Sequence, residues 1–311
     1  MRNFLSIKDL TRDEIIDILD TSCRLKEERK SSKTGEKLRK KTLLLLFEKR
    51  STRTRISFEV AMHELGGTSI YLNPADTQLG RGETIGDTSR VVSRYVHAIA
   101  ARVNDHQTLI ELAENSTIPV INALSDLEHP CQLLADLMTI REEKGRLEGL
   151  RLAWVGDGNN VCNSAILASS LTGIKIRVAT PKGYEPDQEI VRDGRRLGGN
   201  ITVTDDPREA VKGADIVYTD VWTSMGDEEE REQRLIDFKP YQVNRDLLEM
   251  AKDDAIVLHC LPAHRGEEIT DEVMNGPNSK VLDQAENRLH TEKALLLRLL
   301  LEPETINTQI P

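Results

Sequence analysis

The stretch TLLLLFEKRSTRTRISFEVAMHEL, residues 42–65, decides the fold of this chain. Its first part, Thr42 to Leu46, is a short apolar run that predicts a buried strand. Its last part, from Ile56 on, repeats apolar residues at helical spacing, so the polar residues between the two parts fall at a helix N-terminus. A strand followed directly by a helix is the repeating unit of a parallel α/β sheet.

The polar residues Ser51, Thr52, Arg53 and Thr54 predict a site for a small phosphate dianion. Backbone N–H groups and the positive end of the helix dipole attract an anion there, and hydroxyl and guanidinium groups add charge-assisted hydrogen bonds. The alternative is a helix cap with solvated arginines, because Ser and Thr are ordinary N-cap residues. Arg55 lies two residues beyond Arg53, on another helix face, and is expected to be structural.

The whole chain has the composition of a two-domain globular enzyme. Its 311 residues exceed one ordinary core and suggest about two domains of roughly 150 residues. The net charge of -10 argues against sequence-independent nucleic-acid binding and favours an anionic metabolite as partner. The sequence has no apolar run of the about 18 residues that span a membrane, so no membrane association is expected.

The amino terminus and the cysteines predict a cytoplasmic protein without a metal. Thr11 and Glu14 form a capping box where a secretion signal would need a basic segment and an apolar core. The four cysteines, at positions 23, 131, 162 and 260, lack the Cys-x-x-Cys or Cys/His spacing of a metal site. Such scattered cysteines favour reduced thiols.

Short apolar or β-branched runs predict nine strands, and helical patterns separate most of them. The runs are Thr42–Phe47, Ser69–Leu72, His97–Ala101, Ile118–Ala123, Arg151–Val155, Ile174–Ala179, Ile201–Thr204, Ile216–Thr219 and Ala255–Leu258. Strands that alternate with helices predict the α/β class, here as two doubly wound parallel-sheet domains joined by long helices. A long helical pattern that ends at Lys144 divides the strands into two groups.

This division predicts the domains and the position of the active site. We expect a first domain at residues 1–145, completed by a C-terminal helix within residues 285–311, and a second domain at residues 150–284. We expect the active site in the cleft between the two. Ligands of open parallel sheets bind outside the carboxyl ends of the strands.

Polar clusters follow six of the predicted strands at this end. They are Ser51 to Arg55, Arg102, Ser125 to Gln132, Gly156 to Asn160, Asp220 to Gly226 and His259 to Pro262. Chance would scatter polar clusters over both ends of the strands. Their common position therefore favours a bound small molecule more strongly than any single motif does.

Each cluster also has a structural explanation. Arg102 could pair with a surface carboxylate, and His129 could cap the helix that follows it. A neutral imidazole can instead donate to a carbonyl oxygen on which negative charge develops, and Gln132 lies one helical turn further on. Cys260 could be an inert core thiol. Asp220, with Ser224 nearby, combines a carboxylate and a hydroxyl, as expected for binding an ammonium group.

One cluster suggests a different class of protein. Gly156 and Gly158 resemble the start of a dinucleotide fingerprint, but Val161 stands where its third glycine would be. NAD binding is therefore only a weak prediction.

Together these motifs resemble the ornithine carbamoyltransferases over nearly the whole chain. The motifs STRTR at 51–55 and HPCQ at 129–132 match the carbamoyl phosphate signatures that carbamoyltransferases share. The motifs DVWTSMG at 220–226 and HCLP at 259–262 match those of the ornithine branch. The resemblance implies carbamoyl transfer from carbamoyl phosphate to the δ-amine of L-ornithine, which gives L-citrulline and phosphate.

The resemblance also implies the site residues. Those for carbamoyl phosphate are Ser51, Thr52, Arg53, Thr54, Gln78, Arg102, His129, Pro130, Cys131, Gln132, Cys260, Leu261 and Arg288. Those for ornithine are Asn160, Asp220, Ser224 and Met225, and the catalytic residues are Arg102, His129 and Cys260. Gln78 would reach the active site of a neighbouring subunit, which implies a homotrimer or a multiple of trimers. No cofactor or metal is implied.

Three alternatives to this function remain at the level of sequence. The acceptor could be putrescine, N-acetylornithine or aspartate instead of ornithine, although Asp220 favours free ornithine. The chain could be a metabolite-binding protein that lacks the chemistry, or, less in keeping with its motifs, a dinucleotide oxidoreductase.

The charged segment Asp227 to Glu232 suits either a lid or a solvated loop. The direction of metabolism stays open.

Overall fold

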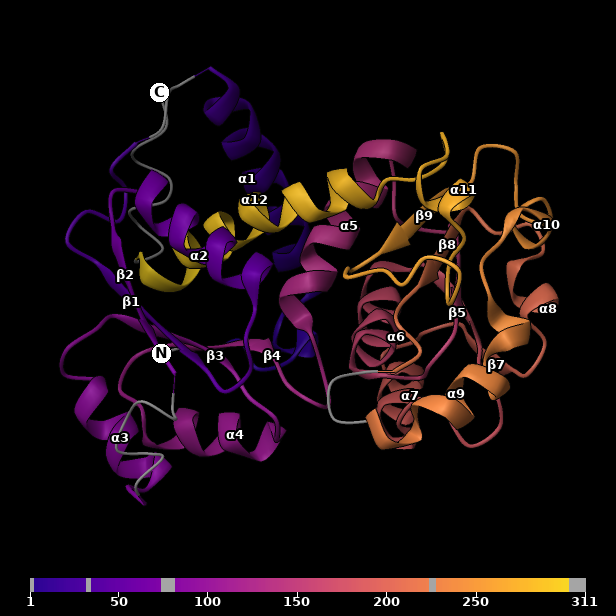
Figure 1. The fold of residues 1–311 in the computed structure, drawn as a ribbon. Helices are drawn as coiled ribbons and strands as arrows, with labels where there is room; N and C mark the ends of the chain where they lie inside the picture. Colours follow the sequence, from indigo (N-terminus) through magenta and orange to yellow (C-terminus); the bar gives the residue numbers. More distant parts are fainter. Residues whose placement is uncertain (1–2, 32–34, 74–81, 224–227, 302–311) are drawn as a thin grey trace. The chain divides into compact units, whose positions relative to one another are not determined.

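The computed structural model describes residues 3–31, 35–73, 82–223 and 228–301 (Figure 1). The chain folds as two compact units, the first made of Met1–Ala135 and Asn287–Pro311 and the second of Asp136–Glu286. The chain passes between the units within helix α5 (Pro130–Lys144) and again within helix α12 (Val281–Leu300). The sequence prediction placed the first passage later, between residues 145 and 150.

The first unit is built on a parallel sheet with the strand order β2-β1-β3-β4. Its strands are β1 (Thr42–Phe47), β2 (Thr68–Leu72), β3 (Ala98–Arg102) and β4 (Val120–Leu124). Its helices are α1 (Arg12–Lys30), α2 (Thr52–Glu64), α3 (Ile85–Val92) and α4 (His106–Asn115), together with the first part of α5 and most of α12. Helix α2 covers one face of the sheet, and α3 and α4 cover the other (Figure 1).

The local sequence explains these elements. Leu43 to Phe47 are buried in β1, as expected for a strand covered by helices on both faces. Thr11 and Glu14 form the predicted capping box at the start of α1, where each side chain bonds the backbone N–H of the other residue. Helix α12 packs into this unit through ion pairs from Arg298 to Glu14 and Asp17.

The second unit contains a parallel sheet with the strand order β7-β6-β5-β8-β9. Its strands are β5 (Arg151–Val155), β6 (Lys175–Ala179), β7 (Ile201–Thr204), β8 (Ile216–Thr219) and β9 (Ile256–His259). Its remaining helices are α6 (Asn160–Thr172), α7 (Gln188–Arg196), α8 (Pro207–Val211), α9 (Arg231–Asp237), α10 (Arg245–Leu248) and α11 (Asp271–Met274). Helices α6 and α7 lie on one face of the sheet and α8 and α10 on the other (Figure 1).

The strand orders decide where a ligand can bind in each unit. The order reverses between β1 and β3 in the first sheet and between β5 and β8 in the second. At such a switch point the connections leave the sheet in opposite directions, so the carboxyl ends of the two neighbouring strands open a crevice. Ser51 follows β1 and Arg102 ends β3, whereas Gly156 follows β5 and Asp220 follows β8. Four of the six predicted polar clusters therefore lie at the two switch points, and the other two follow the neighbouring strands β4 and β9.

The predicted secondary structure is largely confirmed. All nine predicted strands are present, and their ends differ from the predicted ones by no more than two residues. Helix α12 begins at Val281, four residues before the predicted Ala285. The exposed side chain of Leu282 interrupts the apolar pattern of its first turn, which explains the late prediction. No helix in the described ranges has the length and apolar character needed to cross a membrane.

Candidate active site

In the first unit, the polar residues after β1 and β3 contact one another. Ser51 is the N-cap residue of α2, but its hydroxyl makes no capping hydrogen bond and instead accepts one from Nη1 of Arg102, at 3.3 Å. Register explains the contact, since Phe47 at the end of β1 pairs with Arg102. Arg102 is 8% exposed. This burial does not fit the surface position that the salt-bridge alternative assumed for Arg102.

Arg288 of α12 connects three helices around this position. Its Nη1 donates to Oε1 of Gln132 on α5 at 2.9 Å, and its Nη2 donates to Oγ1 of Thr54 on α2 at 3.2 Å. Its Nε and Nη2 both donate to one carboxylate oxygen of Glu292, at 3.1 and 2.8 Å. All four side chains are buried. We call Ser51 to Thr54, Arg102, His129, Gln132 and Arg288 the anion site.

His129 and Cys131, at the start of α5, differ in what they can do. Burial lowers the pKa of His129 well below its ordinary value, and the positive charges of Arg288 and Arg102 lower it further. His129 is therefore a neutral imidazole at physiological pH. Burial also raises the pKa of the Cys131 thiol, which donates to the backbone carbonyl of Asn122 at 3.3 Å. Cys131 is thus a packing residue and not a nucleophile.

The rest of the predicted set lies at the start of two helices. Thr52 and Arg53 are exposed on the first turn of α2, and Pro130 is the first residue of α5. Arg55 pairs with Glu59 of the same helix at 2.9 Å and stacks over the ring of Tyr71. This packing agrees with the structural role predicted for Arg55.

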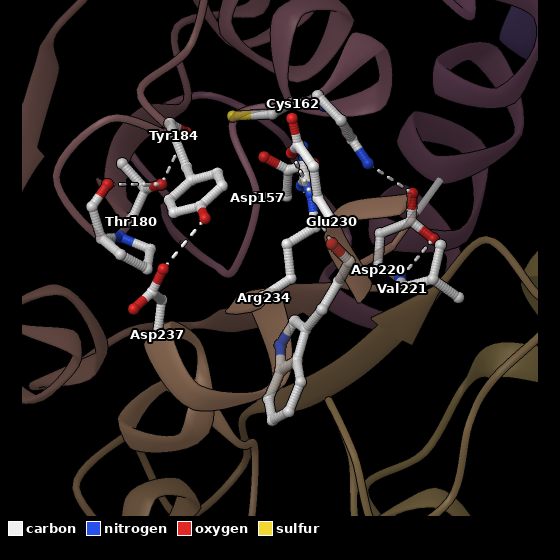
Figure 2. Close-up of polar contacts among 12 residues, drawn as sticks. Asp157, Cys162, Thr180, Tyr184, Asp220, Val221, Glu230, Arg234 and Asp237 are labelled. Carbon is white, nitrogen blue, oxygen red and sulfur yellow. Dashed lines mark hydrogen bonds and ion pairs between the residues drawn. The ribbon is translucent and has the colours of Figure 1, made fainter. Parts of the chain in front are cut away.

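In the second unit, Asp220 is the centre of a second polar cluster. It follows β8, is 5% exposed, and accepts hydrogen bonds on both carboxylate oxygens. Asn159 donates to Oδ2 at 2.8 Å, and the Cys260 thiol donates to Oδ1 at 2.9 Å. The Val221 backbone N–H also donates to Oδ1, at 2.8 Å (Figure 2). We call Asp220, Asn159, Asn160, Cys260 and Leu261 the carboxylate site.

Sequence reasoning missed Asn159 and selected its neighbour Asn160. Asn159 is the N-cap residue of α6, and its Oδ1 accepts from the backbone N–H groups of Val161 and Cys162 at 3.0 and 3.1 Å. Its amide nitrogen remains for Asp220, so one side chain both caps the helix and holds the carboxylate. The signal was an N-cap asparagine at the end of β5. Asn160 is the first residue of α6, and its contact with ornithine stays a prediction.

The turn after β9 is held by a buried pair that the sequence did not reveal. Nδ1 of His259 accepts from the Leu261 backbone N–H at 2.9 Å, so its Nε2 carries the proton and donates to Glu268, also at 2.9 Å. Both side chains are fully buried. Leu261 has a φ of 62°, in the left-handed region that only a well-supported turn tolerates. The pair thus fixes Cys260 beside Asp220.

Arg234 of α9 links the ends of β5 and β8. Its guanidinium pairs with Asp157 and donates to the carbonyl of Trp222, both at 3.0 Å, and it also contacts Glu230 and the ring of Tyr184 (Figure 2). The chain that leads to Ser224 and Met225 is therefore anchored at Trp222. Ser224, Met225 and also Gln78 lie outside the described residues.

The structure bears on two interpretations that the sequence left open, the glycines after β5 and the charged segment after β8. An added Cβ at Gly158 would lie 2.3 Å from the backbone nitrogen of Pro186, so close backbone packing explains this glycine without a dinucleotide. The segment Asp227 to Glu232 begins outside the described residues, but Glu228–Glu230 form a 3-10 helix and α9 starts at Arg231. Its described part is therefore helical and not a loop.

Two groups of side chains in the described residues have the spacing of a metal site: His264, Glu267 and Glu268, and a group at the carboxylate site. Asp220, His259 and Cys260 bring their ligand atoms within 4.8 Å of one another. Both nitrogens of His259 are engaged, however, and Asp220 already accepts three hydrogen bonds. The hydrogen bonds of His259 and Asp220 therefore account for this close grouping of side chains.

Known proteins resemble the chain over nearly its full length. Residues 2–142 match the family model for the carbamoyl-P binding domain of aspartate/ornithine carbamoyltransferase, and residues 148–299 match its Asp/Orn binding domain. The chain is 58% identical to the ornithine carbamoyltransferase of Methanosarcina mazei, over 96% of this chain and 99% of the relative. It is also 58% identical to that of Archaeoglobus fulgidus, over 96% of this chain and 98% of the relative.

Solved structures give the same result. The ornithine carbamoyltransferase from Pyrococcus furiosus has a TM-score of 0.92 at 53% identity and covers 96% of this chain and 97% of its own. The enzyme from Thermus thermophilus has a TM-score of 0.88 at 48% identity, with 96% and 99% covered.

Proposed function

The chain belongs to the aspartate/ornithine carbamoyltransferase family, and from this premise we propose that it transfers the carbamoyl group of carbamoyl phosphate to the δ-amine of L-ornithine. The products are L-citrulline and phosphate. The observation that carries the choice of acceptor is the buried carboxylate of Asp220. In the described part of the chain its hydrogen-bond partners are neutral, and no cationic side chain pairs with it. A buried carboxylate of this kind is suited to an ammonium group of the substrate.

The anion site accounts for carbamoyl phosphate. The N-terminus of α2, with Ser51 to Thr54, holds the phosphate group, and Arg288 keeps Thr54 and Gln132 in place beside it. Arg102 and the neutral imidazole of His129 donate to the carbonyl oxygen. These hydrogen bonds strengthen as that oxygen becomes an oxyanion in the tetrahedral intermediate.

The carboxylate site accounts for ornithine. Asp220 binds the α-ammonium group, and Asn160, Ser224 and Met225 complete the contacts to the amino-acid end of the substrate. Cys260 and Leu261 hold the position that the turn after β9 gives them. Their predicted contact with carbamoyl phosphate is part of this proposal.

The transfer forms one C–N bond and breaks one C–O bond. The free δ-amine attacks the carbamoyl carbon, the oxyanion collapses, and phosphate leaves with the C–O electron pair. The proton that the nitrogen loses passes to the departing phosphate, so no protein base is required. A lysine-like amine has a pKa of about 10.4, and its deprotonation near pH 7 costs roughly 4 to 5 kcal/mol. The positively charged arginines of the anion site disfavour the ammonium form and so help to offset this cost.

We also propose that the protein is a cytoplasmic homo-oligomer, a trimer or a multiple of trimers, in which Gln78 completes a neighbouring active site. Family membership supports this proposal. Light scattering coupled to size exclusion measures the assembly, and a monomer that is fully active would contradict it.

The decisive experiment measures citrulline from carbamoyl phosphate and ornithine, with putrescine, N-acetylornithine and aspartate as parallel acceptors. Strong selectivity for ornithine is the expected result. Activity with another acceptor would keep the anion site and overturn the role of Asp220. No product with any acceptor would favour a binding protein without catalysis.

A further inference from the structure

Glu292 is a buried acid next to the anion site that the proposed reaction does not use. It lies one helical turn beyond Arg288 on α12 and is 1% exposed. Its Oε1 receives two N–H groups of the guanidinium, from Nε and Nη2. A carboxylate oxygen that receives two N–H groups of one rigid fork determines the plane of that fork.

This contact determines which edge of the guanidinium faces the anion site. Glu292 occupies the edge formed by Nε and Nη2. Gln132 receives its hydrogen bond from Nη1, and Thr54 receives one from Nη2, which also donates to Glu292. Both residues are among those that carbamoyl phosphate is proposed to contact. Rotation of the guanidinium away from Glu292 would break both of these hydrogen bonds at once.

The surroundings of Glu292 hold few charges. Arg288 is the charged group that faces it, the Cys131 thiol approaches from α5, and the Ser57 hydroxyl faces it from α2. Within the described residues, the other carboxylate oxygen, Oε2, is buried and receives no hydrogen bond. Burial raises the pKa of Glu292 to about 7, although Arg288 and Ser57 oppose this shift.

We propose that Glu292 is a positioning residue that supports the binding of carbamoyl phosphate through Arg288. The strength with which Glu292 holds the guanidinium depends on the negative charge of its carboxylate. As a carboxylate it keeps Arg288 aimed at Gln132 and Thr54. Once protonated it is a weaker acceptor, and the fork becomes free to turn. The inference rests on the proposed function and adds a pH dependence of substrate binding to it.

The test compares Glu292→Gln with the wild type over a range of pH. Gln keeps the shape and the acceptor oxygen but resembles only the protonated acid. The ratio of the KM values for carbamoyl phosphate, variant over wild type, should be near one at about pH 5.5 and about tenfold at about pH 8.5. Ionisation of the substrate itself cancels in this ratio, and the KM for ornithine should not change.

Two results would overturn the proposal. A ratio that does not vary with pH would mean that Glu292 is only structural, and a ratio below one at high pH would mean that its charge repels the substrate. If the wild type forms no citrulline, the proposed function itself fails, which is a distinct outcome.

Two further variants complete the experiment. In an Arg288→Lys background, Glu292→Gln should change the KM by less than about twofold, because both act through one guanidinium. If the Gln variant does not fold, the KM ratio of Arg288→Lys over wild type should itself fall towards low pH. The matched control is Glu64→Gln, which removes the carboxylate partner of the adjacent Lys293 and should leave the ratio independent of pH.

Discussion

The anion site and the carboxylate site occupy the same position in two similar sheets but treat buried charge differently. Each lies at a topological switch point. In the anion site the central buried group, Arg288, has a buried counter-charge in Glu292. In the carboxylate site Asp220 is held by an amide, a thiol and a backbone N–H group, and no cation in the described ranges neutralises it.

This difference suggests how each site prepares for its substrate. A buried charge without a counter-ion is costly, so Asp220 gains most when an ammonium group arrives. Arg288 is already paired with Glu292 and donates to the neutral side chains of Gln132 and Thr54. In the proposed function, the more exposed Arg53 supplies positive charge to the phosphate. The carboxylate site thus provides an unneutralised buried charge, and the anion site provides hydrogen bonds of fixed orientation.

Arg53→Ala tests the anion site with the largest expected effect. Loss of one charged donor should lower kcat/KM for carbamoyl phosphate by about 10² to 10³ fold. The KM for ornithine should change little. Because Arg53 is exposed, the melting temperature should stay within a few degrees of the wild type. Steady-state kinetics with either substrate varied provide the measurement, and unchanged use of carbamoyl phosphate would exclude Arg53 from the site.

Glu292→Gln tests the cost of the buried ion pair. A pKa raised from 4.5 to about 7 corresponds to about 3 kcal/mol that the folded state loses when Glu292 ionises. The sign follows from the raised pKa: this stability is present below about pH 4.5 and is lost as the pH rises through about 7. The free energy of unfolding of the variant, relative to that of the wild type, should therefore increase as the pH rises from about 5 to about 8.

Urea unfolding at both pH values measures this gain. A stability difference that does not depend on pH would mean that Glu292 does not titrate in the folded protein. With the predicted rise in KM, the variant would be more stable but bind carbamoyl phosphate less well, a common trade-off at functional sites.

Asp220→Asn tests the carboxylate site, where a smaller effect is expected. The amide keeps the size of the side chain and one acceptor, but a hydrogen bond to a charged group is worth about 1.5 to 3 kcal/mol. The KM for ornithine should rise by about 10 to 100 fold, and that for carbamoyl phosphate should not. Putrescine, which lacks the α-ammonium group, provides the control as an acceptor. Normal saturation by ornithine would remove Asp220 from the site.

Arg55→Ala should have the smallest effect and serves as the matched control for Arg53→Ala. Its ion pair with Glu59 and its stacking on Tyr71 are exposed, so the loss of stability should stay below about 1 kcal/mol. Both kinetic constants should match those of the wild type. A defect in carbamoyl phosphate use would place Arg55 in the anion site and contradict its structural role.

Much of the fold and most of the described site residues follow from local patterns. The run Thr42 to Leu46 predicted β1, and the polar residues after it were correctly placed at the start of α2. Asn159 and Glu268 were missed for a physical reason. Each acts through a contact with a residue that is distant in sequence or hidden in a turn, and such a contact leaves no local signature.

The sequence by itself determined the α/β class, the nine strands and the sign of the charge at each cluster, because hydrophobic period and strand-end polarity are local properties. Only the tertiary structure decided which polar groups share a buried site. Thr54, Gln132 and Arg288 come from three helices, and Arg288 is more than 150 residues away from Gln132 along the chain. Their hydrogen bonds, and the role of Glu292 beside them, depend on burial and orientation, which packing alone establishes.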